Sequence, residues 1–177
     1  MKLYFVKNGI EWLDRRYQNP VSGIYDFHLA AENRVELKEI AEEIIRVDYP
    51  TFIKENWAID IEEIEKVMGE KAKRYSVRLE EVTDRRSQRI GVQLGLFSII
   101  GNVTGSTTLN GIRIKTSEMY DFHLVAKNER KARTITNQIF RAEGYKKEYL
   151  HVERVEEVIG KPHKKYLVKL EEIEEEV

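Results

Sequence analysis

Two short segments of this chain contain the residue types that could do chemistry. Asp26 and His28 lie two positions apart, and Asp121 and His123 repeat that spacing 95 positions later (121 − 26). Two imidazoles and two carboxylates would suit a divalent transition metal. Alternatively, the two histidines would act as general bases oriented by the aspartates. A site that uses all four side chains requires the two segments to lie together in the fold.

The same residues belong to a repeated pentapeptide, Tyr-Asp-Phe-His-Leu, at positions 25–29 and 120–124. In a strand, alternate side chains point to opposite faces, so Tyr, Phe and Leu share one face and Asp and His share the other. The competing interpretation is therefore structural: the apolar face fills a core and the Asp–His face covers the other side. Retention in both copies favours this structural role.

The repeat extends beyond the pentapeptide. Apolar residues at helical spacing follow each copy at the same offset, and the segment after them matches at an offset of 91 (152 − 61). The change of four positions falls in the loop after the helix, where insertions are tolerated. We predict a tandem duplication, with repeats at 1–83 and 84–177. Each repeat would contain a β-hairpin, a strand, one helix and a closing β-hairpin, giving an α+β fold with antiparallel sheets and a pseudo-two-fold axis.

Local signals place the elements of each repeat. Asn8-Gly9 between apolar runs predicts a type I′ hairpin turn, and 19–23 predicts a second turn. Asn33, with Glu36 three positions later, predicts a helix N-cap. For residues 60–69 we favour a bulged strand over a short helix.

In the second repeat, a helix is expected from about Asn128. We expect a linker at 83–89, a strand at 90–100 and a small-residue loop at 101–108.

The two repeats differ in charge. The helical stretch 33–49 has a formal charge of −2 (three basic, five acidic), whereas 128–144 has +2 (four basic, two acidic). Each closing hairpin also contains a basic turn. These cations are candidate phosphate contacts for DNA or RNA. They are Lys71, Lys73, Arg74, Arg130, Lys131, Arg133, Lys161, Lys164 and Lys165.

A charge-rich solvated surface is the competing interpretation of the basic turns, and an acidic protein partner is a third. The sequence shows no base-stacking motif and no helix-turn-helix pattern to accompany the cations.

Composition narrows the class of protein. The 177 residues are 34% charged, have a net charge of −1 and include no cysteine, which excludes disulfides and thiolate chemistry. This charge-rich composition is typical of heat-adapted proteins. The longest apolar tract is shorter than the roughly 20 residues of a membrane span, so we expect a cytoplasmic protein without a membrane partner.

Sequence motifs of enzymes are absent, and no cofactor is expected. We therefore predict a non-enzymatic binding or interaction module, with nucleic acid as the first partner to test. The alternatives are a metal-dependent or histidine-based enzyme centred on the Asp-x-His strands, and a structural subunit that acts through a protein partner or self-association.

Overall fold

The structure is a computed structural model that describes residues 1–83 and 94–174. Most of the expected linker (83–89) and the start of the strand expected at 90–100 lie outside the described residues. The predicted α+β class with antiparallel sheets is confirmed. The described chain forms two compact units: unit 1 contains residues 1–65, 77–83 and 157–169, and unit 2 contains residues 66–76, 94–156 and 170–174.

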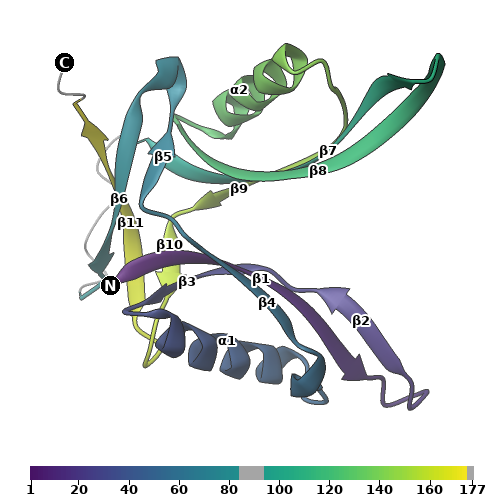
Figure 1. Ribbon diagram of the computed structural model, residues 1–177. Helices are drawn as coiled ribbons and strands as arrows, with labels where there is room; N and C mark the ends of the chain where they lie inside the picture. Colours follow the sequence, from purple (N-terminus) through teal and green to yellow (C-terminus); the bar gives the residue numbers. More distant parts are fainter. Residues whose placement is uncertain (84–93, 175–177) are drawn as a thin grey trace. The chain divides into compact units, whose positions relative to one another are not determined.

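Unit 1 is built on one long strand, β1 (Figure 1). Residues 2–6 of β1 pair with β3, residues 9–13 pair with β2, and β4 pairs along the other edge. β10 joins β3 in parallel and pairs with β11 in antiparallel orientation. The elements are β1 (Lys2–Leu13), β2 (Pro20–Ile24), β3 (Phe27–Ala31), α1 (Arg34–Asp48), the 3₁₀ turn η1 (Lys54–Asn56), β4 (Ala58–Glu63) and β10 (Glu157–Ile159). The strands β6 (Arg74–Glu81) and β11 (Lys165–Ile173) contribute residues to both units.

The helix of unit 1 begins where the sequence predicts. The Asn33 side chain accepts hydrogen bonds from the backbone N–H groups of Val35 and Glu36, each at 3.0 Å. The apolar stripe of α1 then packs on one face of the sheet. The shared core consists of Tyr4, Val6, Leu29, Ala31, Leu37, Ile40 and Ala41.

The prediction of a hairpin turn at Asn8-Gly9 is wrong, because β1 continues through both residues. Asn8 is fully buried, and its side chain satisfies two groups that packing removes from water. Its amide N–H donates to the Tyr25 carbonyl at 2.7 Å, and its amide oxygen accepts from the Trp57 indole N–H at 2.9 Å. The chain instead reverses at 14–19. The turn predicted at 19–23 is also wrong, because Pro20–Ile24 form β2.

Unit 2 contains a three-stranded antiparallel sheet in the order β8-β7-β9, covered on one face by α2 (Figure 1). Asn128 caps the helix, as predicted, by accepting from the Lys131 N–H at 2.8 Å. The core cluster contains Phe97, Ile99, Leu124, Ala126, Ala132 and Val152. The elements are β5 (Lys66–Met68), the 3₁₀ turn η2 (Glu70–Ala72), β7 (Gly95–Leu109), β8 (Ile112–Ala126), α2 (Glu129–Ala142) and β9 (Lys146–Val155), together with the unit 2 parts of β6 and β11.

The small residues at 101–108 form a strand and not the predicted loop, because β7 runs without interruption to Leu109. Two of these glycines leave room for aromatic rings. A Cβ on Gly101 would lie 2.9 Å from Phe140, and one on Gly105 would lie 3.1 Å from Tyr145. The hairpin turn lies just beyond, at Asn110-Gly111, where both residues have positive φ (51° and 78°).

Residues 60–69 form strands β4 and β5, as favoured from the sequence. The segment between the helix and the next strand is longer in unit 1 (49–57) than in unit 2 (143–145), at the place where the sequence offset changes.

The compact units do not coincide with the predicted repeats 1–83 and 84–177. Residues 66–76, which contain β5 and the β5–β6 turn of the first predicted repeat, belong to unit 2, where Gly69 bridges in parallel to Val125. The closing hairpin of the second repeat belongs to unit 1, where Ile159 pairs in parallel with Leu29. In each unit, a segment of one predicted repeat thus pairs with the strand of the other predicted repeat that contains the Phe-His-Leu residues or directly follows them.

Glycine permits this close approach in both units. A Cβ on Gly69 would lie 3.1 Å from the Val125 carbonyl oxygen, and one on Gly160 would lie 3.0 Å from that of Ala30.

Candidate functional site

The Asp-x-His side chains of unit 1 have local structural contacts. A carboxylate oxygen of Asp26 accepts the Asn8 backbone N–H at 3.0 Å. The His28 ring stacks on Phe5, with the ring centroids 4.6 Å apart. Leu29 on the opposite face lies in the core, with Phe27 packed against it. These contacts agree with the structural interpretation of the first pentapeptide.

The second Asp-x-His pair lies on β8 in unit 2, where Asp121 pairs opposite Ile100 and His123 opposite Ser98. Across residues 1–83 and 94–174, no three histidine or carboxylate side chains are grouped as metal ligands would be. The geometry therefore gives no support to the metal hypothesis based on Asp26, His28, Asp121 and His123.

The basic turn of unit 1 is matched by carboxylates. Lys161 pairs with Glu39 on α1 at 3.1 Å, and Lys164 and Lys165 pair with Glu81 and Glu157, each at 3.3 Å. The hydrogen bond to Glu39 and the nearby carboxylates hold the pKa of Lys161 above its ordinary value. All three predicted phosphate contacts on this turn thus already have anionic partners.

The cations of unit 2 are only partly matched. Lys73 pairs with Glu172 at 2.8 Å, Lys131 with Glu70 at 3.0 Å, and Arg133 with Glu129 at 2.9 Å. Arg74 lies on β6 opposite Met68. In contrast, Lys71 and Arg130 have no carboxylate within 4.0 Å among the described residues. Unit 2 therefore offers cations that an external anion can use without displacing a partner.

These cations surround two adjoining hollows of about 580 and 360 Å³, which share Glu70 and Lys127. The hollows lie between the β5–β6 turn, the end of β8 and the start of α2; we call them the cationic groove. Five cations and two carboxylates line it, a net charge of +3 in a chain whose total is −1. The charged lining residues are Lys71, Lys73, Lys127, Arg130, Lys131, Glu70 and Glu172.

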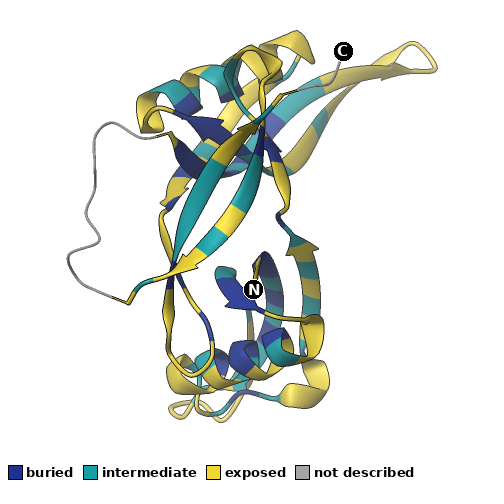
Figure 2. Ribbon diagram, turned by 90° about the vertical axis from the view of Figure 1, so that its left-hand side faces the viewer, coloured by how far each residue is buried: buried dark blue, intermediate teal, exposed yellow. Residues whose placement is uncertain are grey.

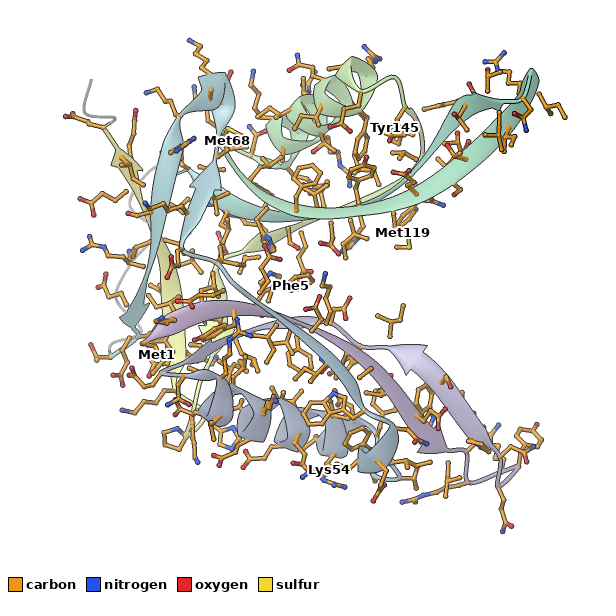
Figure 3. The ribbon with its side chains drawn as sticks, in the orientation of Figure 1. Met1, Phe5, Lys54, Met68, Met119 and Tyr145 are labelled. Atoms are coloured by element: carbon orange, nitrogen blue, oxygen red, sulfur yellow. The ribbon has the colours of Figure 1, made fainter. Side chains whose placement is uncertain are left out.

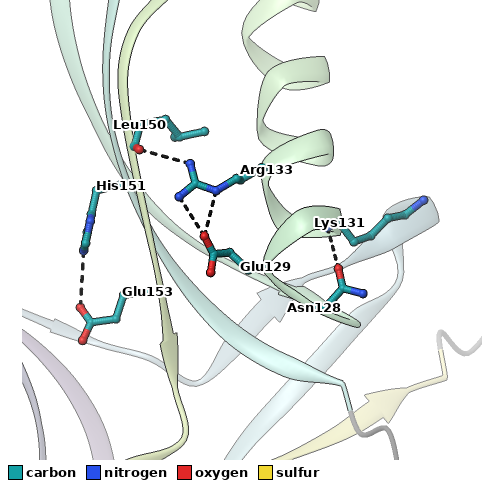
Figure 4. A network of polar contacts seen from close by, with 7 residues as sticks. All are labelled: Asn128, Glu129, Lys131, Arg133, Leu150, His151 and Glu153. Atoms are coloured by element: carbon teal, nitrogen blue, oxygen red, sulfur yellow. Dashed lines mark hydrogen bonds and ion pairs between the residues drawn. The ribbon is translucent and has the colours of Figure 1, made fainter.

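The start of α2 completes the groove. Figure 4 shows the Asn128 cap and, on another side of the helix, Arg133 bonded both to Glu129 and to the Leu150 carbonyl. The partial positive charge of a helix N-terminus adds to that of the side chains. Within the groove, the hydrogen bond from Lys131, together with the charges of Lys127 and Lys71, holds the pKa of Glu70 below its ordinary value.

Sequence reasoning did not single out Lys127 as a member of this site. The only available signal was its position directly before the Asn128 cap, which places it at a helix N-terminus.

A second exposed feature of unit 2 is the distal part of the β7–β8 hairpin, residues 104–117, which we call the arm. β9 pairs with β7 only as far as Thr104, so the arm is a two-stranded ribbon among the described strands. Figure 2 shows that its end is exposed, and Figure 3 shows Tyr145 and Met119 on opposite faces of the hairpin. The arm was missed because its first half was predicted as a loop.

Comparison with protein-family models, with curated proteins and with solved structures finds no match to this chain. In the part of the chain that the structure describes, neither helix has both the length and the apolar character needed to cross a bilayer. Functional inference consequently depends on the geometry of the chain itself.

Proposed function

We propose that this protein is a non-enzymatic binding module for nucleic acid, and that the cationic groove of unit 2 contacts the phosphate backbone. The observation that supports this proposal is the net charge of +3 around the groove, where Lys71, Lys127 and Arg130 have no carboxylate partner within ion-pair distance among the described residues. The whole chain has a net charge of −1, so the positive charge around the groove is a local excess.

Unpaired cations matter because phosphate binding gains free energy chiefly by releasing counterions. A lysine already paired with a carboxylate must first break that pair, so it gains less on binding. The turn that contains Lys161, Lys164 and Lys165 is therefore the weaker of the two predicted contact surfaces. The proposal keeps Lys71 and Arg130 from the sequence prediction and adds Lys127.

The test is the salt dependence of binding to a labelled DNA duplex and to a labelled RNA, followed by fluorescence anisotropy. Each phosphate contact contributes about 0.9 to the slope of log affinity against log salt concentration. The triple variant Lys71→Ala, Lys127→Ala, Arg130→Ala should reduce the magnitude of that slope by about 2.7. Circular dichroism of the variant verifies that the fold is retained, since all three side chains are exposed or line a surface hollow.

The matched control removes the same number of cations from the other turn, with Lys161→Ala, Lys164→Ala and Lys165→Ala. Its slope should change by less than about 1, because those lysines have carboxylate partners. Absence of binding at low salt, binding without salt dependence, or equal effects of the two triple variants would contradict the proposal.

A further inference from the structure

The arm of unit 2 has two chemically different faces. Paired residues of adjacent antiparallel strands share a face, so Leu109, Ile112 and Ile114 lie on one side with Thr107. Arg113 and Lys115 lie on the other side, opposite Thr108 and Ser106. The hydrogen bond from Arg113 to the Ser106 hydroxyl, 3.2 Å long, agrees with this assignment. The arm is thus an exposed amphipathic ribbon.

The charged side chains of the arm itself have one sign: residues 104–117 contain Arg113 and Lys115 and no Asp or Glu. At the base of the polar face, Lys146 of β9 pairs opposite Thr104, and the Thr104 hydroxyl donates to the Glu148 carboxylate at 3.1 Å. Serine and threonine side chains (Thr104, Ser106, Thr108 and Ser117) fill the remaining positions on that face and add donors and acceptors. Such a surface is complementary to an anion with many hydrogen-bonding groups.

The tip of the arm is apolar. Leu109 and Ile112 pair with each other across the Asn110-Gly111 turn, and they are 61% and 67% exposed. Two large aliphatic side chains at the end of a ribbon remain in water unless a partner covers them. Apolar side chains in this position are used by DNA-binding proteins as wedges between base steps, which bend the duplex.

A second copy of the chain is a poor binding partner for the arm. Two arms paired through their β8 edges would bring Arg113 and Lys115 of one chain close to the same cations of the other, and like charges oppose that pairing. Duplex DNA, in contrast, presents phosphates on both sides of a groove. The arm has six residue pairs from Thr104–Ser117 to Leu109–Ile112, a length of roughly 20 Å that fits along a groove.

We propose that the arm lies in a groove of duplex DNA, that Arg113 and Lys115 contact the phosphates, and that Leu109 and Ile112 enter between base steps and bend the duplex. This inference rests on the proposed nucleic-acid function and specifies its partner as double-stranded DNA.

The experiment measures binding and bending with the full chain. A duplex with a donor and an acceptor dye at its two ends reports bending by energy transfer, and anisotropy reports affinity. Heparin, a polyanion without grooves, serves as the comparison ligand. The wild-type protein should raise the energy transfer of the duplex.

The variant Leu109→Ser, Ile112→Ser should bind the duplex but lose most of the bending. The variant Arg113→Ala, Lys115→Ala should lose about 1.8 from the magnitude of the salt slope for duplex DNA, with a smaller loss for heparin. The control Arg15→Ala, Arg16→Ala removes the same two charges from the exposed β1–β2 turn of unit 1 and should change bending little.

The outcomes separate the two proposals. If the groove triple variant weakens DNA binding while both arm variants bind and bend DNA like the wild type, the arm inference is wrong and the proposed function stands. If the wild type binds neither DNA nor heparin, both are wrong. Preferential binding of single-stranded DNA or RNA, or arm-dependent self-association seen by light scattering without DNA, would also overturn the arm inference.

Discussion

The two units begin from similar sequence and differ most at their long hairpins. In unit 1, the end of β1 is covered by the segment 49–57: Phe52 bridges to Trp12, and the Ile53 N–H donates to the Glu11 carbonyl at 2.9 Å. In unit 2 only residues 143–145 follow the helix, and the hairpin extends past Tyr145 as an exposed arm. The shorter loop therefore leaves unit 2 with a free ribbon.

The two units also differ in the charge of their helices and of the turns beside them. In unit 1 the acidic helix α1 provides Glu39 to Lys161 of the docked hairpin, whereas in unit 2 the basic helix α2 provides Lys131 to Glu70 of the docked hairpin. The acidic helix α1 thus faces a basic turn in unit 1, whereas in unit 2 the basic helix α2 pairs with one glutamate of a hairpin that also contains Lys71 and Lys73. The basic turn of unit 1 is therefore neutralised by carboxylates, whereas unit 2 keeps an excess of cations.

The largest effect on stability is expected at the position where β1 and β7 differ most. The Tyr25 N–H donates to the Asn8 carbonyl at 2.9 Å, Gly101 lies opposite Tyr120, and of these two positions only Asn8 has a buried amide. The substitution Asn8→Ala leaves the Tyr25 carbonyl and the Trp57 indole N–H without their partner and should lower the free energy of unfolding by about 3 kcal/mol. Denaturant unfolding measures it, and a loss below about 1 kcal/mol would contradict the role of Asn8.

The second expected effect on stability concerns two glycines, Gly69 and Gly160, at equivalent close approaches of the backbone. An added Cβ would lie 2.7 Å from the Tyr75 ring at Gly69 and 2.8 Å from the Tyr166 ring at Gly160. It would also lie 3.1 Å from the Val125 carbonyl oxygen and 3.0 Å from that of Ala30, so Gly69→Ala and Gly160→Ala should each cost about 2 kcal/mol. Hydrogen exchange locates the damage: Gly160→Ala should deprotect β3, and Gly69→Ala should deprotect the end of β8 near Val125. Deprotection confined to the mutated hairpin's own repeat would show that the hairpins are not exchanged.

A smaller effect concerns the tyrosine that both repeats share. Burial and the hydrogen bond to Asp48 raise the pKa of Tyr25 to about 12, and the hydrogen bond with Tyr145 also raises the pKa of Tyr120. A raised pKa stabilises the fold at pH values below the unfolded-state pKa of about 10, and this contribution is lost as pH rises toward the folded-state value.

Tyr25→Phe should therefore flatten the alkaline loss of stability between pH of about 10 and about 12, as followed by denaturant midpoints. An unchanged alkaline profile in Tyr25→Phe would assign that pH dependence to other groups.

The smallest expected effect is at the helix–hairpin ion pairs. Lys161→Glu places a carboxylate beside Glu39, and Glu70→Lys places an ammonium beside Lys131, so each should lower the melting temperature slightly at low salt. The double variant Lys161→Glu, Glu39→Lys should restore it, and high salt should remove the difference. Failure of the double variant to restore stability would mean that these charges do not favour the exchange.

The elements predicted correctly are those whose signals lie within a few residues of one another in the sequence. Asn33 and Asn128 each cap a helix by their own side chain, and the apolar spacing after them defines the buried face, so both helices are found at the expected positions. Asn-Gly was a reliable turn signal at 110–111 but not at 8–9, where contacts with Tyr25 and Trp57, far along the chain, hold Asn8 in a strand.

The candidate site was predicted only in part for the same reason. Basic residues are visible in the sequence, but their partners are not: Glu39 lies 122 positions before Lys161, and Glu70 lies 61 positions before Lys131 (131 − 70). Small residues at 101–108 suggested a loop because the rings of Phe140 and Tyr145, which require glycine in the strand, lie further along the chain.

We propose that unit 2 contacts nucleic acid and that the basic turn of unit 1 does not. Acetylation of lysines by a small reagent, with and without duplex DNA and read residue by residue by mass spectrometry, tests it directly. DNA should protect Lys71, Lys115 and Lys127, while the reactivity of Lys161, Lys164 and Lys165 should stay unchanged. Protection of the unit 1 turn equal to or greater than that of the groove and arm would contradict it.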